Sequence, residues 1–328
     1  MKILVTGGAG FIGSHFVDRL LRRDDVEHVT VLDALTYAGN LANLEVAVST
    51  GRCEFVHGNI LDAQLTGGLV ARHDAVVHFA AESHVDRSLV DAGRFISTNV
   101  AGTHTLLEAA RRAGVSRFVH ISTDEVYGSL ETGAATEQWP LAPSIPYAAS
   151  KAASDMVARS FFETYGVPVC ITRSSNNYGP RQHPEKVIPR FVSSLLQGRA
   201  VTVHGDGGHQ RNWLHVEDNC AGIELVLDHG VPGEVYNIGG GHDLTTNQLA
   251  TLLLGILGAD RVMLRHVPDR TANDLRYAMD WSKIAHLGYR PAHDLGASLA
   301  ATVAWYRANP GFWQHAAPLA ADLTPAEV

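Results

Sequence analysis

Ile3-Leu4-Val5-Thr6-Gly7-Gly8-Ala9-Gly10-Phe11-Ile12-Gly13, near the start of the chain, joins an apolar run to a glycine-rich turn and a helical pattern. Glycines spaced in this way permit a tight turn, let backbone N–H groups approach a pyrophosphate and allow close packing of helix on strand. The N-terminus of the helix adds positive partial charge for an anion. Because strand, turn and helix coincide, the stretch predicts a dinucleotide-binding site. Its residues are Gly7, Gly10, Phe11, Ile12 and Gly13.

Short apolar runs alternate with amphipathic helical patterns, such as Phe11–Arg22 and Ile96–Ala113, through the first half of the chain. The runs predicted as strands are Ile3–Thr6, His28–Leu32, Glu54–His57, Ala75–Phe79, Phe118–Ser122 and Val167–Thr172. They are continuously apolar, as expected for parallel strands that are buried on both faces. The alternation predicts an α/β fold with a Rossmann-like, doubly wound parallel sheet, whose ligands lie at the carboxyl ends of the strands.

Beyond the sixth predicted strand the alternation breaks. We therefore expect a cofactor-binding domain over residues 1–173 and a smaller C-terminal α/β substrate-binding domain over 174–314. A segment of about 201–229 could fold back onto the first domain, and 315–328 is expected to be a frayed tail. Gly239-Gly240-Gly241 lacks dinucleotide spacing and is interpreted as a strand-to-helix turn.

Composition narrows the class of protein. The 328-residue chain is 45% hydrophobic, has a net charge of -8 and lacks blocks of like charge, which argues against a nucleic-acid partner. Its three cysteines lie far apart in or beside apolar runs, which predicts buried reduced thiols and a cytoplasmic location. No run approaches the ~20 apolar residues of a membrane span, and the first residues are interpreted as a strand, not a signal peptide. The 18 histidines show no metal-binding spacing, so no metal is predicted.

The ends of the second, third and fourth predicted strands carry residues suited to the cofactor. Asp33 can accept hydrogen bonds from ribose hydroxyls and would repel a 2′-phosphate, which favours NAD over NADP. The third strand ends at Asn59-Ile60, where adenine is expected. The fourth ends at Phe79-Ala80-Ala81, whose small residues suit backbone lying against the cofactor.

Two acid–base pairs follow the fifth predicted strand. Tyr147 and Lys151 lie four residues apart on one face of a helical pattern, so the ammonium, together with a positive nicotinamide ring, would lower the pKa of the phenol. Asp124 and Glu125 are adjacent in Ser122-Thr123-Asp124-Glu125-Val126-Tyr127-Gly128. Two interacting acids can be held one protonated and the other ionised, which supplies an acid and a base at one place.

Three cations, Lys186, Arg211 and Arg276, recur among Asn, Gly and Trp in the second half of an acidic chain. Arginine and lysine in such a setting suggest a clamp for a diphosphate.

These motifs resemble the extended short-chain dehydrogenase/reductase family. The Asp-Glu pair narrows the resemblance to its nucleoside-diphosphate-hexose 4,6-dehydratases, and the dTDP-glucose 4,6-dehydratases are similar from Lys2 to about Trp313. The matching strings include Ala80-Ala-Glu-Ser-His-Val-Asp-Arg-Ser88, Asn176-Asn-Tyr-Gly-Pro180, His183-Pro-Glu-Lys186 and Asn237-Ile-Gly-Gly240. The resemblance implies NAD as cofactor, with Thr98 among its contacts, and a homodimer formed through the helices of Ile96–Ala113 and Tyr147–Tyr165.

The implied activity is that of a hydro-lyase, which converts dTDP-glucose to dTDP-4-keto-6-deoxy-glucose and water. Tyr147 would remove the C4 hydroxyl proton while Thr123 holds that oxygen, and Lys151 would bond the nicotinamide ribose. Glu125 would then take the C5 proton as Asp124 protonates the departing C6 hydroxyl, and hydride would return to C6. By the same resemblance the substrate ligands are Ser83, Thr123, Asn176, Glu185, Lys186, Arg211, Asn237, Arg276 and Tyr277.

Three positions depart from the family pattern: Asn59, Asn212 and the string Ala272-Asn273-Asp274. The last two leave thymidine and uridine open as the base. Other nucleotide-sugar dehydratases, acting on UDP-linked or amino sugars, and 4-epimerases remain alternatives. A different class, a non-catalytic protein that binds NAD or a nucleotide sugar, is opposed by the intact acid–base residues.

Overall fold

Seven parallel strands form the main sheet of the computed structural model, which describes residues 1–269 and 273–314. Their spatial order is β10-β6-β5-β4-β1-β2-β3, the doubly wound order with one strand added at the β6 edge. The strands are β1 (Lys2–Thr6), β2 (His28–Asp33), β3 (Cys53–His57), β4 (Ala75–His78), β5 (Arg117–Thr123), β6 (Val169–Ser174) and β10 (Val235–Ile238). The predicted Rossmann-like sheet is confirmed, and β1 to β6 match the six predicted strands to within two residues at each end.

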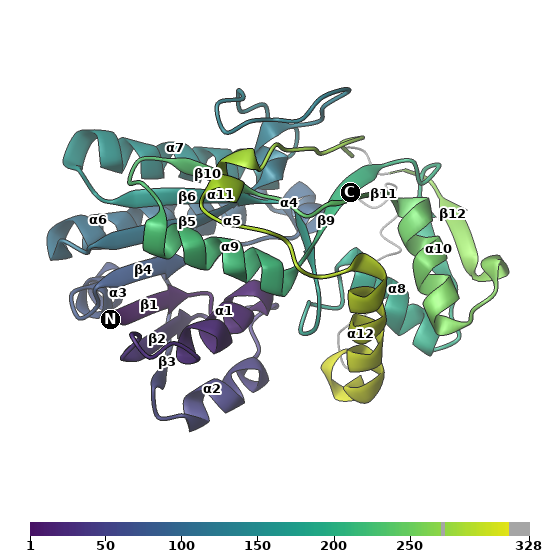
Figure 1. Cartoon of the computed structure of the whole chain (residues 1–328), viewed down its shortest axis with the longest axis horizontal. Coiled ribbons are helices and arrows are strands. Elements are labelled where there is room, and N and C mark those ends of the chain that lie inside the picture. Colours follow the sequence, from purple (N-terminus) through teal and green to yellow (C-terminus); the bar gives the residue numbers. More distant parts are fainter. Residues whose placement is uncertain (270–272, 315–328) are drawn as a thin grey trace.

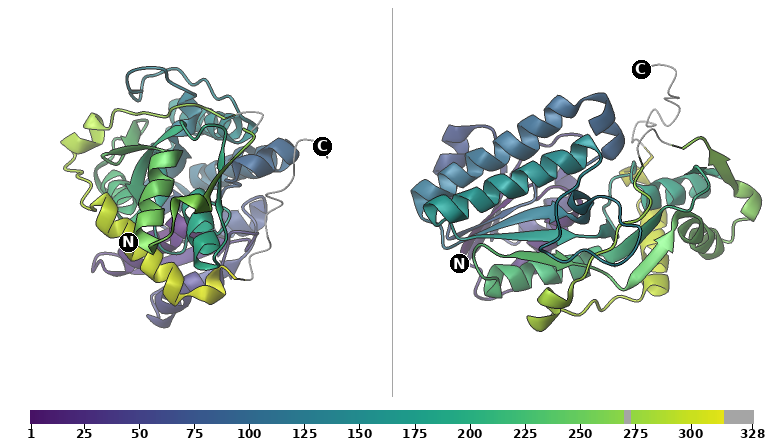
Figure 2. Two further views of the ribbon diagram at one scale, coloured as in Figure 1. Left: turned by 90° about the vertical axis from the view of Figure 1, so that its right-hand side faces the viewer. Right: turned by 90° about the horizontal axis from the view of Figure 1, so that it is seen from above.

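Helices cover both faces of this sheet (Figures 1 and 2). One face packs against α1 (Phe11–Leu21) and α9 (Val216–His229), and the other against α3 (Ala63–Val70), α6 (Thr103–Ala113) and α7 (Pro146–Tyr165). Ile3, Leu4 and Val5 of β1 alternate between these two cores, which is why three apolar residues follow one another there. Shorter helices fill the connections: α2 (Glu45–Ser49), α4 (Val85–Val90), α5 (Ala92–Phe95), α11 (Ser282–His286) and the 3-10 turns η1 (Leu41–Leu44) and η3 (Asp124–Tyr127).

The helix predicted over Ile96–Ala113 is divided. Residues Ile96–Gly102 form a π-helical turn, η2, and α6 begins at Thr103. The turn contains buried Asn99, whose amide donates to the Glu82 carbonyl and the Ser150 hydroxyl. π-helical turns of this kind often lie at functional sites.

The remainder of the chain builds a smaller part around its own core (Figure 1). Its strands form a sheet of order β11-β9-β7 and a pair β12-β8. Its elements are β7 (Asn176–Tyr178), α8 (Val187–Leu196), β8 (Val201–His204), β9 (Gln210–His215), β11 (His242–Thr245), α10 (Thr246–Leu257), η4 (Arg261–Met263), β12 (Leu264–Val267), α12 (Leu295–Ala308) and η5 (Pro310–Phe312). Within 201–229, β8 and β9 lie in these small sheets, whereas α9 packs on the main sheet.

One local prediction is wrong. Gly239–Gly241 connects strand β10 to strand β11 and does not lead into a helix. Gly240 is required there, because a Cβ atom would lie 2.2 Å from the Trp213 carbonyl oxygen. The predicted tail 315–328 and Ala272 lie outside the described residues.

None of the helices in the described ranges has the length and apolar character needed to cross a membrane. The three cysteines are buried free thiols.

Candidate active site

The glycine turn between β1 and α1 forms a cradle that side chains would fill. A Cβ atom on Gly7 would lie 2.5 Å from the Ala80 nitrogen, and one on Gly13 would lie 2.3 Å from the Gly7 carbonyl oxygen. Gly7 also has a φ of 73°, which disfavours other residues. Helix α1 begins after Gly10 without a side-chain cap. Its N-terminus therefore presents backbone donors beside Phe11 and Ile12, a geometry that fits the pyrophosphate of a dinucleotide.

Asp33 stands next to this cradle at the end of β2. Its carboxylate accepts hydrogen bonds from the backbone N–H groups of Ala9 (3.0 Å) and Leu35 (2.8 Å). Burial raises its pKa, and these two bonds act in the opposite direction. The bonds fix the Asp33 carboxylate beside the turn. The backbone donors of the turn and this acceptor together fit the adenosine half of NAD.

The other predicted cofactor residues lie along the same sheet edge with different exposures. Ile60 is buried and packs against Gly102, whereas Asn59 is exposed and its side chain accepts from the Leu61 N–H at 2.9 Å. Half-buried residues at the end of β4 and in η2 complete the set: Phe79, Ala80, Ala81 and Thr98.

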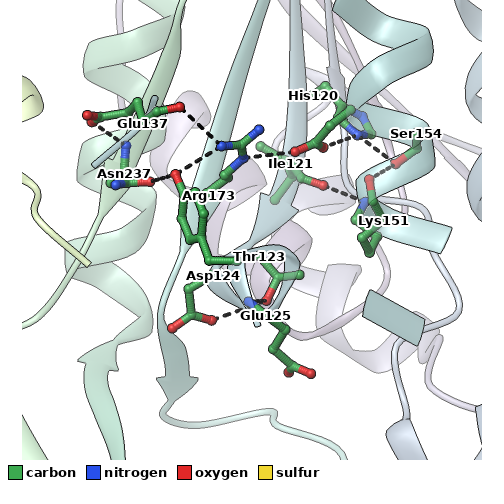
Figure 3. Close-up of polar contacts among 12 residues, drawn as sticks. His120, Ile121, Thr123, Asp124, Glu125, Glu137, Lys151, Ser154, Arg173 and Asn237 are labelled. Carbon is green, nitrogen blue, oxygen red and sulfur yellow. Dashed lines mark hydrogen bonds and ion pairs between the residues drawn. The ribbon is translucent and has the colours of Figure 1, made fainter. Parts of the chain in front are cut away.

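The 3-10 turn η3 carries the two predicted acids directly after β5 (Figure 3). Thr123 caps this turn, accepting from the Glu125 N–H at 3.3 Å and donating to Asp124 Oδ1 at 3.3 Å. Asp124 is 2% exposed, and its Oδ2 has no hydrogen-bond partner. Burial and then the Glu125 carboxylate raise the pKa of Asp124 to about 8. Asp124 is therefore mostly protonated at neutral pH, beside the half-buried Glu125.

Helix α7 carries the predicted Tyr–Lys pair. Lys151 is 4% exposed and donates from Nζ to the Ile121 carbonyl at 2.7 Å. Burial lowers the pKa of Lys151 to about 8, against the attraction of Asp155. Burial and then Glu125 raise the pKa of Tyr147 well above its usual value, with Thr123 acting in the opposite direction. The predicted lowering of the phenol pKa is therefore absent in the chain alone.

Residues of the smaller part reach this acid–base set. The Arg211 guanidinium lies 4.3 Å from the centre of the Tyr277 ring. Burial and then Glu125 raise the pKa of Tyr277, and Arg211 opposes the rise in the pKa of Asp124. Arg211 and Tyr277 therefore lie close enough to the two acids for their charges to interact. Arg276 donates to the Gly133 carbonyl at 2.9 Å, in the loop that follows η3.

A second group of predicted substrate ligands lies where the loop after β4 meets the segment before α8. Lys186 donates from Nζ to the Ser83 carbonyl at 2.7 Å. Buried Glu185 pairs with Arg87 at 3.1 Å, and the Arg87 guanidinium lies 4.0 Å from the centre of the Tyr37 ring. Half-buried Asn176 has an Oδ1 without a hydrogen-bond partner, which leaves an acceptor for a ligand.

Asn237 differs from the other predicted ligands. It is fully buried, and its amide donates to the carbonyls of Ala135 (3.0 Å) and Asp280 (2.9 Å). Its Oδ1 accepts from the Tyr127 hydroxyl at 2.7 Å. This side chain is placed to join protein segments, and both of its donors are used in doing so.

Two of the departures from the family pattern also have structural partners. Asn212 donates to Asp243 at 2.7 Å and accepts from the Gly240 N–H at 2.8 Å, so it links β9 to β11. Asn273 accepts from Arg211 at 3.4 Å and donates to Asp269 at 3.0 Å. Within the described ranges, no group of three or more His, Cys, Asp or Glu side chains is arranged to hold a metal ion.

Several residues beside the site were not predicted, and two of them are buried. Asp155 is one helical turn beyond Lys151, and Arg173 is the partner of Asp155. The spacing of four from Lys151 to Asp155 could have indicated the first of these, because i and i+4 share a helix face. The pairing of half-buried Arg87 with Glu185 was not predicted either, because it joins residues far apart in the chain.

Comparisons with known proteins agree with this geometry. The model of the family described as GDP-mannose 4,6 dehydratase matches residues 4–302. A dTDP-glucose 4,6-dehydratase of an Actinoplanes species is 55% identical, over 95% of this chain and 100% of the relative. The crystal structure of DesIV, a dTDP-glucose 4,6-dehydratase from Streptomyces venezuelae with NAD and TYD bound, is 55% identical with a TM-score of 0.95, covering 96% of this chain and 100% of that one. A UDP-glucuronic acid 4-epimerase from Bacillus cereus is 29% identical with a TM-score of 0.89, covering 94% and 99%.

Proposed function

The chain belongs to the GDP-mannose 4,6 dehydratase family and, within it, to the dTDP-glucose 4,6-dehydratases, and on this premise we propose how its residues divide the reaction. The protein is an NAD-dependent hydro-lyase that converts dTDP-glucose to dTDP-4-keto-6-deoxy-glucose and water. The observation that carries the division of roles is the pair of acids on η3, one of them with a pKa of about 8. A 4-epimerase needs no second acid–base pair, since it eliminates nothing.

The Tyr–Lys pair serves oxidation at C4. Tyr147 takes the proton of the C4 hydroxyl, Thr123 holds that oxygen, and Lys151 bonds the nicotinamide ribose. The glycine turn and Asp33 would hold NAD, which when bound would supply the hydride acceptor at C4 and later the hydride donor at C6. The helix fixes Tyr147 and Lys151 on one face, so Tyr147 can reach the sugar while Lys151 reaches the nicotinamide ribose beside it.

The acid pair serves elimination. A ketone at C4 acidifies the proton on C5, and Glu125 is the base that removes it. Asp124, protonated at neutral pH, donates a proton to the departing C6 hydroxyl. That proton leaves as part of the water, and the proton taken from C5 is available to return there when C6 is reduced.

The nucleotide end of the substrate is assigned to the smaller part. Arg211, Arg276 and Lys186 would offset the diphosphate charge, and Tyr277 with Asn176 would contact the sugar and the nucleotide. We further propose a cytoplasmic protein, for which the buried free thiols offer support.

We also propose a homodimer through η2, α6 and α7. Large apolar side chains are exposed there, with Met156 at 67%, Tyr165 at 56% and Ile96 at 52%. Sedimentation equilibrium would report twice the chain mass if this assembly forms.

The function is tested by incubating the purified protein with dTDP-glucose, and separately with UDP-linked sugars, without added cofactor. Mass spectrometry should show a dTDP-sugar product lighter by one water. A product of unchanged mass but altered configuration would indicate an epimerase. Binding of the nucleotide sugar without any product would indicate a non-catalytic protein. Dehydration of the UDP-linked sugar alone would show that the substrate carries uridine and not thymidine.

A further inference from the structure

Hydrogen bonds join four buried polar side chains, Asp155, Arg173, Tyr127 and Asn237, in a row that is here called the Asp155–Asn237 chain. Arg173 and Asn237 are labelled in Figure 3. Asp155 Oδ2 accepts from Arg173 Nε at 2.9 Å, and an Arg173 terminal nitrogen donates to the Tyr127 hydroxyl at 2.9 Å. The Tyr127 hydroxyl donates in turn to Asn237 Oδ1 at 2.7 Å. None of the four residues is more than 5% exposed.

The Asp155–Asn237 chain joins the two halves of the proposed active site. Asp155 lies on α7 one turn after Lys151, in the helix that carries the redox pair. Tyr127 is the last residue of η3, the turn that carries Asp124 and Glu125. Arg173, on β6, bridges the two with different nitrogens of one guanidinium.

Asn237, the last member of the Asp155–Asn237 chain, is anchored as well. The Asn237 amide binds the Ala135 and Asp280 carbonyls, and its backbone N–H donates to Glu137 Oε1 at 3.0 Å. The loop that leads from η3 to α7 is therefore held at the same point as the end of η3.

A need for stability alone does not account for this arrangement. Buried ion pairs seldom stabilise a fold more than well-packed apolar residues would, because both charges must be desolvated. What such a pair does provide is direction, since the planar guanidinium fork fixes the angle between its two partners. His120, 3.3 Å from Asp155 Oδ1, and the Arg173 guanidinium stacked 4.9 Å from the centre of the Tyr127 ring restrict the arrangement further.

We propose that Arg173 and Tyr127, anchored by Asp155 and Asn237, are positioning residues for the elimination half of the reaction. They hold η3 at the distance from Tyr147 and Lys151 that lets one sugar ring meet both pairs. The inference rests on the proposed function and deepens it. Lys151 has its own anchor on the Ile121 carbonyl, so a break in the chain should displace the acids on η3 more than the redox pair.

The test uses two variants that break the same link while keeping the buried charges. Tyr127→Phe removes only the hydroxyl between Arg173 and Asn237. Arg173→Lys keeps a cation beside Asp155 but loses the fork that reaches Tyr127. The matched control is Tyr178→Phe, which removes a buried hydroxyl bonded to Ser298 in the smaller part.

Single turnovers of dTDP-glucose are followed by NADH absorbance and, in quenched samples, by loss of water. Misplacing a reacting group by about 1 Å can cost up to about 10²-fold in rate. We expect NADH to form within about twofold of the wild-type rate in both variants, and water loss to slow by about tenfold, so that NADH accumulates. Tyr178→Phe should follow the wild type in both phases.

Equal slowing of the two phases, or a Tyr127→Phe protein that behaves like Tyr178→Phe, would overturn the proposal. If one variant cannot be isolated folded, the other breaks the same link and is judged in the same way. A wild-type protein that releases no water contradicts the proposed function itself, whereas a wild type that turns over normally leaves the positioning role as the only part under test.

Discussion

The two acid–base pairs, one on η3 and the other on α7, differ in how far residues of the protein set their pKa values. On η3, burial and the neighbouring carboxylate raise the pKa of Asp124 to about 8, so an acid is present at neutral pH. On α7, burial raises the pKa of Tyr147 and lowers that of Lys151 to about 8, so both groups are moved toward their neutral forms.

This difference shows how the work is divided between the fold and the cofactor. The elimination acids are placed and tuned by residues of the chain alone. The redox pair is placed by the chain, but a phenol with a raised pKa becomes a good base only when a further positive charge is brought near it. Oxidised NAD carries such a charge in its nicotinamide ring.

The largest effect is expected from removing the base of the redox pair. Tyr147→Phe removes the group that takes the C4 hydroxyl proton, and turnover should fall by about 10⁴-fold, the upper end of the worth of a general base. Because the phenyl ring is kept, NAD content should remain that of the wild type. A single-turnover rise in NADH absorbance at the normal rate would contradict the assignment.

A smaller effect on turnover is expected from replacing the acid of the elimination pair, and this replacement should also alter thermal stability. Asp124→Asn cannot donate the proton to the C6 hydroxyl, so turnover should fall by about 10²-fold while NADH still forms. The variant should also change the dependence of the melting temperature on pH.

The raised pKa of Asp124 determines whether stability rises or falls with pH. The folded protein holds the Asp124 proton up to a pH of about 8, whereas the unfolded chain releases it at about 4. The stability that comes from the bound proton is therefore complete below about pH 4 and is lost as pH rises through about 8. Wild type should lose melting temperature relative to Asp124→Asn across this range, and Asp24→Asn, at an exposed site, should not reproduce the effect. Parallel melting curves for wild type and Asp124→Asn would contradict the burial argument.

Local sequence predicted most of the fold because the signals that mark its strands and turns are local. Ile3, Leu4 and Val5 are apolar in succession, which predicted burial on both faces, and Gly7 marks a turn that other residues disfavour. The π-helical turn at Ile96–Gly102 and the strand connection at Gly239–Gly241 were not anticipated. Both depend on partners elsewhere in the chain, Glu82 and Ser150 for the first and Trp213 for the second.

The site was predictable to the extent that its residues lie next to one another in motifs. Asp124 and Glu125 are adjacent, and Tyr147 and Lys151 share a helix face. The Asp155–Asn237 chain could not be predicted from spacing, because Tyr127, Arg173 and Asn237 meet only after three strands have aligned. The direction of the Tyr147 pKa was also beyond the sequence, since it is raised first by burial and then by Glu125, and neither effect can be read from the spacing to Lys151.

The most direct test of this division of roles is a single turnover of dTDP-glucose by Glu125→Gln. We predict that NADH absorbance rises at the wild-type rate and persists, while loss of water slows by about 10²- to 10⁴-fold. Glu131→Gln, at an exposed position in the loop after η3, should behave as wild type. Water loss at the normal rate would remove Glu125 from the elimination, and absence of NADH would show that the two pairs do not act separately.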